Sequence, residues 1–134
     1  MAKGKFYVCR EEGTVIGVLE EGQGTLECCE GVLTCCGKPM QEMTPNTTDA
    51  AQEKHVPVIR VEGQTVTVTV GSTLHPMTAE HLISWIYLET KQGGQRKVLA
   101  AGDAPQAVFA LTEDDAPVAA YAYCNLHGLW KAEV

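Results

Sequence analysis

Strict alternation of apolar and polar residues marks the second half of the chain as β-structure. Residues 65–70 read Thr-Val-Thr-Val-Thr-Val, which places the three valines on one face of a strand and the threonines on the other. A second segment rich in valine and isoleucine, residues 58–62, precedes this strand across Gly63. The two segments together predict a tight hairpin.

Further segments of the same apolar and β-branched character follow at short intervals. Residues 85–91 and 97–101 flank a Gly-Gly pair at positions 93 and 94, which predicts a hairpin that turns at the two glycines. The remaining segments are 107–112, 118–124 and 130–134. Strands at this spacing predict an all-β domain, an immunoglobulin-like β-sandwich, over residues 53–134.

Residues 1–40 predict a separate, small β unit. Short apolar segments at 6–8 and 14–19 are separated by glycines, as expected for short strands and turns. A unit of this size buries little apolar surface, so it needs a metal, a disulfide or a partner subunit. Residues 41–52 are polar, contain Pro45 and predict a linker.

Charge and composition narrow the functional classes. The net charge is −7 and the pI is near 5.0, which argues against nucleic-acid binding and means that an anionic substrate would need a local positive group. No apolar run approaches the roughly 20 residues of a membrane span. Lys3 and Lys5 are not followed by an apolar segment, so no signal peptide is evident and we expect a cytoplasmic protein.

Four histidines fall in the segments between the predicted strands of the sandwich, and one cysteine stands at the end of a predicted strand. They are His55, His75, His81, Cys124 and His127. Any one histidine alone would more often be an unrelated surface or core residue. Their concentration in loops, where rigid scaffolds present functional groups, indicates a metal site.

The donor types restrict the metal. Calcium and magnesium prefer oxygen ligands, and structural zinc normally takes four ligands, so a fifth would be surplus. A blue-copper site would place a methionine shortly after the last histidine, yet residues 128–131 are Gly-Leu-Trp-Lys. Iron with an open coordination position is compatible with imidazole and thiolate ligands, although elimination alone leaves the alternatives open.

Three motifs resemble one family closely. They are Glu-Lys-His-Val-Pro-Val-Ile at 53–59, His-Pro-Met-Thr-Ala-Glu-His-Leu-Ile-Ser-Trp-Ile at 75–86, and Cys-Asn-Leu-His-Gly-Leu-Trp-Lys at 124–131. In this order they resemble the superoxide reductases, desulfoferrodoxin and neelaredoxin. The resemblance implies one non-haem ferrous ion per chain on an immunoglobulin-like domain, with Cys124 as axial ligand and four equatorial histidines: His55, His75, His81 and His127.

The resemblance also implies a reaction and roles for two neighbouring residues. The reaction is the one-electron reduction of superoxide to hydrogen peroxide, with an external donor such as a rubredoxin returning the electron. Lys54 matches the family lysine that attracts superoxide, and Glu53 matches the glutamate that can occupy the sixth position of the oxidised iron. From the residues alone, Glu53 and Lys54 would be read as a solvated surface pair.

The N-terminal cysteines depart from the family pattern. The unit resembles a desulforedoxin-like domain, in which a Cys-x-x-Cys pair and a Cys-Cys pair hold a second iron. Here Glu12 replaces the second cysteine of the first pair. A second iron could still use four of the five cysteines, or the unit could serve only folding and dimerisation; the cysteines are Cys9, Cys28, Cys29, Cys35 and Cys36.

Two other kinds of protein remain as alternatives. One is an electron-transfer metalloprotein without catalytic turnover of superoxide, and the other is a structural zinc module. The resemblance favours a superoxide reductase that forms a homodimer or homotetramer.

Overall fold

The structure, a computed structural model, describes residues 2–20, 33–35 and 37–134. It divides the chain into two compact units, Lys3–Met43 and Thr44–Val134. Each unit is described by itself.

The described residues of the N-terminal unit form two small antiparallel sheets. Strands β1 (Phe6–Val8), β2 (Val15–Gly17) and β5 (Gln41–Glu42) form a sheet in the order β2-β1-β5, and β3 (Thr34–Cys35) pairs with β4 (Lys38–Pro39). Gln41–Glu42 was expected in a linker but forms a strand, because it pairs with Tyr7 and Val8 of β1. The backbone N–H of Met43 then donates to the carbonyl of Phe6 at 2.9 Å.

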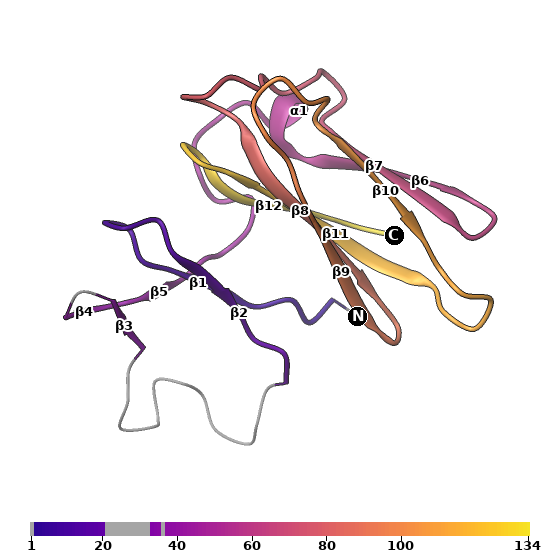
Figure 1. Cartoon of the computed structure of the whole chain (residues 1–134), viewed down its shortest axis with the longest axis horizontal. Coiled ribbons are helices and arrows are strands. Elements are labelled where there is room, and N and C mark those ends of the chain that lie inside the picture. Colours follow the sequence, from indigo (N-terminus) through magenta and orange to yellow (C-terminus); the bar gives the residue numbers. More distant parts are fainter. Residues whose placement is uncertain (1, 21–32, 36) are drawn as a thin grey trace. The chain divides into compact units, whose positions relative to one another are not determined.

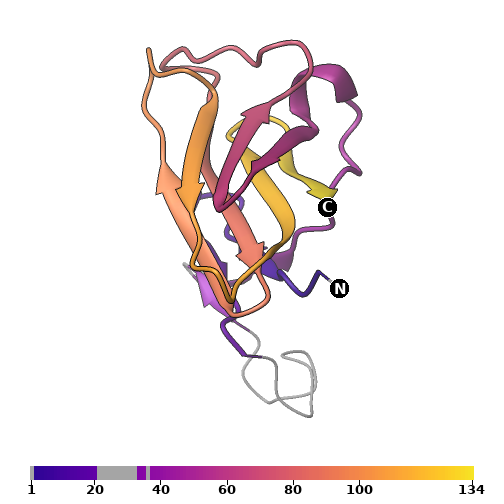
Figure 2. The ribbon, with the colours of Figure 1, turned by 90° about the vertical axis from the view of Figure 1, so that its right-hand side faces the viewer.

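The C-terminal unit is a sandwich of two antiparallel sheets (Figures 1 and 2). The first sheet has the order β10-β7-β6. The second has the order β12-β11-β8-β9. Their strands are β6 (Pro57–Glu62), β7 (Thr65–Val70), β8 (Ile83–Thr90), β9 (Gly93–Val98), β10 (Gln106–Ala110), β11 (Pro117–Cys124) and β12 (Gly128–Glu133). The predicted all-β sandwich is confirmed.

Inward-facing side chains at alternate positions of the strands form the core, and the Cys124 thiol occupies one such position at the end of β11. The three valines of β7 are fully buried, as the alternation predicts. On β11, Ala120, Ala122 and Cys124 take the same inward-facing positions and are likewise fully buried. Cys124 is the last residue of its strand, so its sulfur lies where the core opens into the loops.

A single helical turn, α1 (Gln52–His55), precedes β6. The N–H of Val56 closes it on the carbonyl of Gln52 at 2.9 Å, and Pro57 then begins the strand. Figure 1 shows α1, the loop before β8 and the β11–β12 hairpin at the same end of the sandwich. Among the described residues, no helix has the length and apolar character needed to cross a membrane.

The predicted turn at the glycine pair is wrong by two residues. The chain turns at Lys91 and Gln92, and both glycines belong to β9. The loop before β11 holds this turn, because the Gln92 N–H donates to Asp115 Oδ1 at 3.1 Å. Gly94 is required inside the strand for another reason. A Cβ at Gly94 would lie 2.1 Å from the Tyr87 hydroxyl oxygen on the neighbouring strand.

Candidate metal centre

The four imidazoles form a square at one end of the sandwich. Going round it, the ring centroids are 4.7 Å apart for His55 and His75, 4.6 Å for His75 and His81, 5.1 Å for His81 and His127, and 4.9 Å for His127 and His55. Neighbouring rings are nearly perpendicular, and the His55–His81 diagonal is longer, at 6.4 Å. Segments far apart in sequence therefore bring all four rings around one point.

Hydrogen bonds fix which nitrogen of two rings is available to a metal. His55 Nδ1 lies 2.6 Å from the carbonyl oxygen of Ala51, and His75 Nδ1 lies 2.6 Å from that of Pro76. A carbonyl can only accept, so each Nδ1 carries the proton and each Nε2 presents its lone pair. A hydrogen bond from the ring nitrogen that does not bind the metal is the usual way in which proteins orient a metal-binding histidine.

Two ring nitrogens of the square lack a hydrogen-bond partner among the described residues. Nε2 of His75 and Nε2 of His81 are buried, and neither makes a hydrogen bond within the described part of the chain. An unpaired buried polar atom costs about 1–3 kcal/mol, so such atoms call for an explanation. A metal ion bound between the rings would satisfy both lone pairs.

The remaining distances also fit a metal. His127 Nδ1 lies 3.1 Å from His55 Nε2 and 3.8 Å from the Cys124 sulfur. Two nitrogens bound at right angles to a metal about 2.1 Å away would be about 3 Å apart. The donor atoms of His55, His81, Cys124 and His127 all lie within 4.8 Å of one another. His75 is outside that group of four, yet its ring occupies the remaining corner of the square.

Burial favours the neutral form of three of the rings, which is the form that binds a metal. It lowers the pKa of His55 and of His81, and it lowers the pKa of His75 to about 4. The charge of Lys54 acts in the same direction on the pKa values of His55 and His81. The positive charge of Lys54 therefore contributes to the electrostatic potential at the imidazole square.

Two opposing effects act on the pKa of the Cys124 thiol. Burial raises the pKa of the thiol, while hydrogen bonds from the backbone N–H groups of Leu126 and His127 oppose the rise by stabilising the thiolate. The His127 N–H lies 3.4 Å from the sulfur. A bound cation would complete the ionisation, because metal coordination deprotonates a thiol.

Glu53 and Lys54 are exposed on α1, directly before the first ring of the square. The Glu53 carbonyl accepts hydrogen bonds from the backbone N–H of Thr73 at 2.9 Å and from the Ser72 hydroxyl at 3.2 Å. Gly71 packs against the same turn so closely that a Cβ there would lie 2.6 Å from the Glu53 oxygen. The turn 71–73 thus serves as a seat for the residues that precede His55.

Sequence reasoning missed the residues that support the square. Trp130 is fully buried, stacks on His55 at 4.7 Å between ring centroids, and donates from Nε1 to the His127 carbonyl at 3.1 Å. Asn125 bonds to the loop that carries His81. Both residues lie within the 124–131 motif, so their position next to Cys124 and His127 was the sequence feature that could have identified them.

The structure describes two of the five N-terminal cysteines, Cys9 and the backbone of Cys35. Cys9 is buried in a turn where the Gly13 N–H donates to its carbonyl at 2.8 Å. Cys28, Cys29 and Cys36 lie outside the described residues, and only the backbone of Cys35 is described. A second iron at these cysteines stays a prediction.

Comparison with known proteins identifies relatives along the whole chain. Residues 47–133 match the family model described as desulfoferrodoxin. A desulfoferrodoxin from Nitratidesulfovibrio vulgaris is 45% identical over 129 residues, which are 96% of this chain and 95% of that protein. A superoxide reductase from Pyrococcus horikoshii is 38% identical over 112 residues, covering 71% of this chain and 97% of that one.

A solved structure matches equally widely. The superoxide reductase from Treponema pallidum superposes with a TM-score of 0.80 and 37% identity, covering 98% of this chain and all of that one. Fold and site together define a β-sandwich protein with a candidate histidine–cysteine metal centre. The chain belongs to the desulfoferrodoxin family, which confirms the resemblance seen in its motifs.

Proposed function

We propose that the protein is a superoxide reductase with one iron per chain. The ligands are the thiolate of Cys124 and the imidazoles of His55, His75, His81 and His127. The observation that carries the proposal is the square of imidazoles with the thiol beside it, in which two buried ring nitrogens find no partner in the described parts of the chain. Relatives named superoxide reductase support the same reaction.

The reaction takes one electron and two protons for each superoxide, giving one hydrogen peroxide. A ferrous ion held by these five residues would supply the electron, so an external one-electron donor would be needed for each turnover. We propose a small rubredoxin-like protein as that donor. The thiolate of Cys124 contributes electron density to the metal, as thiolates do in haem enzymes.

Lys54 gives the site a local attraction for the anionic substrate. The chain carries a net charge of −7, so its overall field repels superoxide. Lys54 is exposed and stands next to His55, and its charge reaches two rings of the square. We assign it the steering of superoxide to the metal and the support of proton delivery through water.

Glu53 takes its role from the family resemblance. It is exposed on the same turn and precedes His55 by two positions. We propose that its carboxylate would serve as a further ligand of the iron once the iron is oxidised. The predicted cytoplasmic location and the homodimer or homotetramer stay predictions.

Stopped-flow mixing of reduced, iron-loaded protein with superoxide tests the proposal. Replacing Lys54→Ala should slow oxidation of the iron about tenfold at low ionic strength, leave the iron content unchanged, and lose most of its effect in high salt. Arg60→Ala is the matched control, because it changes the net charge equally but removes an exposed cation of β6 that pairs with Glu62.

Two outcomes would contradict these assignments. An unchanged rate in Lys54→Ala at low salt would remove the steering role. Failure of superoxide to oxidise the reduced wild-type protein would favour the alternative, an electron-transfer metalloprotein without superoxide turnover.

A further inference from the structure

Asn125 stands in the loop of Cys124 and makes three hydrogen bonds to the loop of His81. Its backbone N–H donates to the carbonyl of Leu82 at 3.2 Å. Its side-chain Oδ1 accepts from the Leu82 N–H at 3.0 Å, and its Nδ2 donates to the carbonyl of Glu80 at 2.9 Å. The bonds therefore reach the residues on both sides of His81.

The orientation of this side-chain amide follows from its partners. The Leu82 N–H can only donate and the Glu80 carbonyl can only accept, so reversing the amide would lose both bonds. The side chain is exposed, yet its two polar atoms are both used by backbone groups of the other loop. Asn125 thus links two segments that are more than 40 residues apart in the sequence.

The bonds of Asn125 lie directly beyond the point where the regular pairing of β8 and β11 ends. Strands β8 and β11 pair regularly from Ala119 to Tyr123, and the register then shifts between Tyr123 and Cys124. Beyond that irregularity, the bonds of Asn125 continue the connection between the strands. They do so at the point where the side chains proposed to bind iron leave the sheet.

We propose that Asn125 is a positioning residue that sets the placement of the His81 imidazole relative to the Cys124 thiolate. The inference rests on the proposed function, because the thiolate and the imidazole are taken as ligands of one iron. The Asn125 side chain bonds to backbone groups of Leu82 and Glu80 and is not one of the proposed ligands. Its effect should appear in the strength of the iron–sulfur bond and in the retention of iron.

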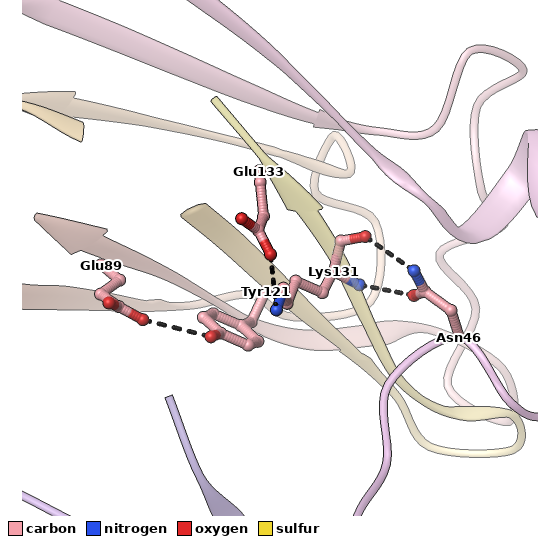
Figure 3. Close-up of polar contacts among 5 residues, drawn as sticks. All are labelled: Asn46, Glu89, Tyr121, Lys131 and Glu133. Atoms are coloured by element: carbon pink, nitrogen blue, oxygen red, sulfur yellow. Dashed lines mark hydrogen bonds and ion pairs between the residues drawn. The ribbon is translucent and has the colours of Figure 1, made fainter. Parts of the chain in front are cut away.

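Asn46 offers a matched comparison within the same unit. Its backbone N–H donates to the Leu129 carbonyl at 3.0 Å. Its side-chain Nδ2 donates to the Lys131 carbonyl at 3.0 Å, and its Oδ1 accepts from the Lys131 N–H at 2.7 Å (Figure 3). These three bonds have the same chemistry, but they reach β12. Because β12 pairs with β11 along its whole length, we expect it to keep its position when the Asn46 bonds are removed.

The test compares Asn125→Ala with Asn46→Gly in the full-length, iron-loaded protein. Glycine is used at Asn46 because its φ of 63° would strain alanine. We expect Asn125→Ala to shift the thiolate-to-iron absorption band and to release iron to a chelator about 10–100 times faster than wild type. Asn46→Gly should lower the unfolding temperature but leave the band and the rate of iron release unchanged.

Failure of this inference can be distinguished from failure of the proposed function. If wild type binds iron with a thiolate band and Asn125→Ala keeps the same band and release rate, the positioning role is overturned. An equal change in Asn46→Gly would also overturn it, since the effect would then be general. A wild-type protein without the band would overturn the proposed function instead.

Asn125→Asp keeps the experiment decisive if the alanine variant does not fold. The carboxylate can still accept from the Leu82 N–H, but it places an oxygen against the Glu80 carbonyl where the amide donated. A shifted band and faster iron release are again expected. A wild-type spectrum and release rate in folded Asn125→Asp would count against the proposal.

Discussion

The four histidines fall into two pairs that the protein holds in different ways. His55 and His75 are each 3% exposed, and each ring is tied to a backbone carbonyl by its own Nδ1. His81 and His127 are only half-buried, and hydrogen bonds fix the loops that carry them, through Asn125 and through the indole N–H that binds the His127 carbonyl. The first pair is oriented at the ring and the second through the backbone.

This difference predicts different consequences for changes at the two sides of the square. Disturbing the side of His55 and His75 should alter protonation and folding, because burial dominates there. Disturbing the side of His81 and His127 should alter the metal's electronic properties, because the thiolate belongs to the same loop as His127.

The largest effect is expected from Cys124→Ser on the loop side. Losing the thiolate should abolish the thiolate-to-iron absorption band of the proposed centre, because a serine hydroxyl does not replace sulfur as an electron donor. Visible spectra of the iron-loaded proteins measure this. Leu126→Ala, an exposed position in the same loop, should keep the band. If the band survives in Cys124→Ser, the thiolate is not a ligand.

The next effect concerns pH and the buried side of the square. In the metal-free protein the pKa of His75 is about 4, against 6.5 for an unperturbed histidine, so below pH 6.5 the unfolded chain binds a proton that the folded chain resists. The free energy of unfolding should therefore fall by about 3 kcal/mol as the pH drops from above 6.5 to about 4.

Urea unfolding with a chelator present, at several pH values, checks this trend. His75→Asn should weaken the pH dependence, because the titrating ring is gone. A free energy of unfolding that stays constant or rises below pH 6.5 would mean that burial does not hold this ring neutral.

A steric change at the seat of α1 should have a somewhat smaller effect. Gly71→Ala would place a Cβ 2.6 Å from the Glu53 carbonyl oxygen, which is backbone and cannot move aside alone. We expect a loss of about 1–3 kcal/mol in the free energy of unfolding. Displacement of Lys54 should also slow the reaction with superoxide. Unfolding curves and stopped-flow rates that both match wild type would show that the seat is not needed.

The smallest effect is expected from Ser72→Ala in the same seat. The Ser72 hydroxyl is one of two donors to the Glu53 carbonyl, and the Thr73 N–H remains when it is removed. The exposed bond should contribute no more than about 1 kcal/mol to the free energy of unfolding. A loss larger than that of Gly71→Ala would reverse the order that the contacts predict.

The sequence predicted the sandwich because its core strands carry strong local patterns. The Thr-Val repeat of β7 could be assigned to a buried face without knowing its neighbours. The turn after β8 could not be placed from its own residues, because Gln92 bonds to Asp115, which is distant along the chain. The strand Gln41–Glu42 was missed because its composition is polar and only pairing with β1 makes it a strand.

The candidate site shows the same limit. The histidines and Cys124 stood out by residue type and by motif, and the structure brings them together. Their supports did not stand out, because the roles of Gly71 and Asn125 depend on segments distant along the chain. A glycine or an asparagine in a loop has many ordinary explanations until its partners are known.

Product analysis after anaerobic mixing of reduced, iron-loaded protein with superoxide tests the proposed chemistry most directly. Reduction predicts one hydrogen peroxide for each ferrous ion oxidised, with no oxygen released. Equal amounts of oxygen and peroxide would indicate dismutation, and an iron that stays ferrous would indicate that superoxide is not the substrate. Either result would contradict the proposal that this square of imidazoles and its thiolate form a superoxide-reducing centre.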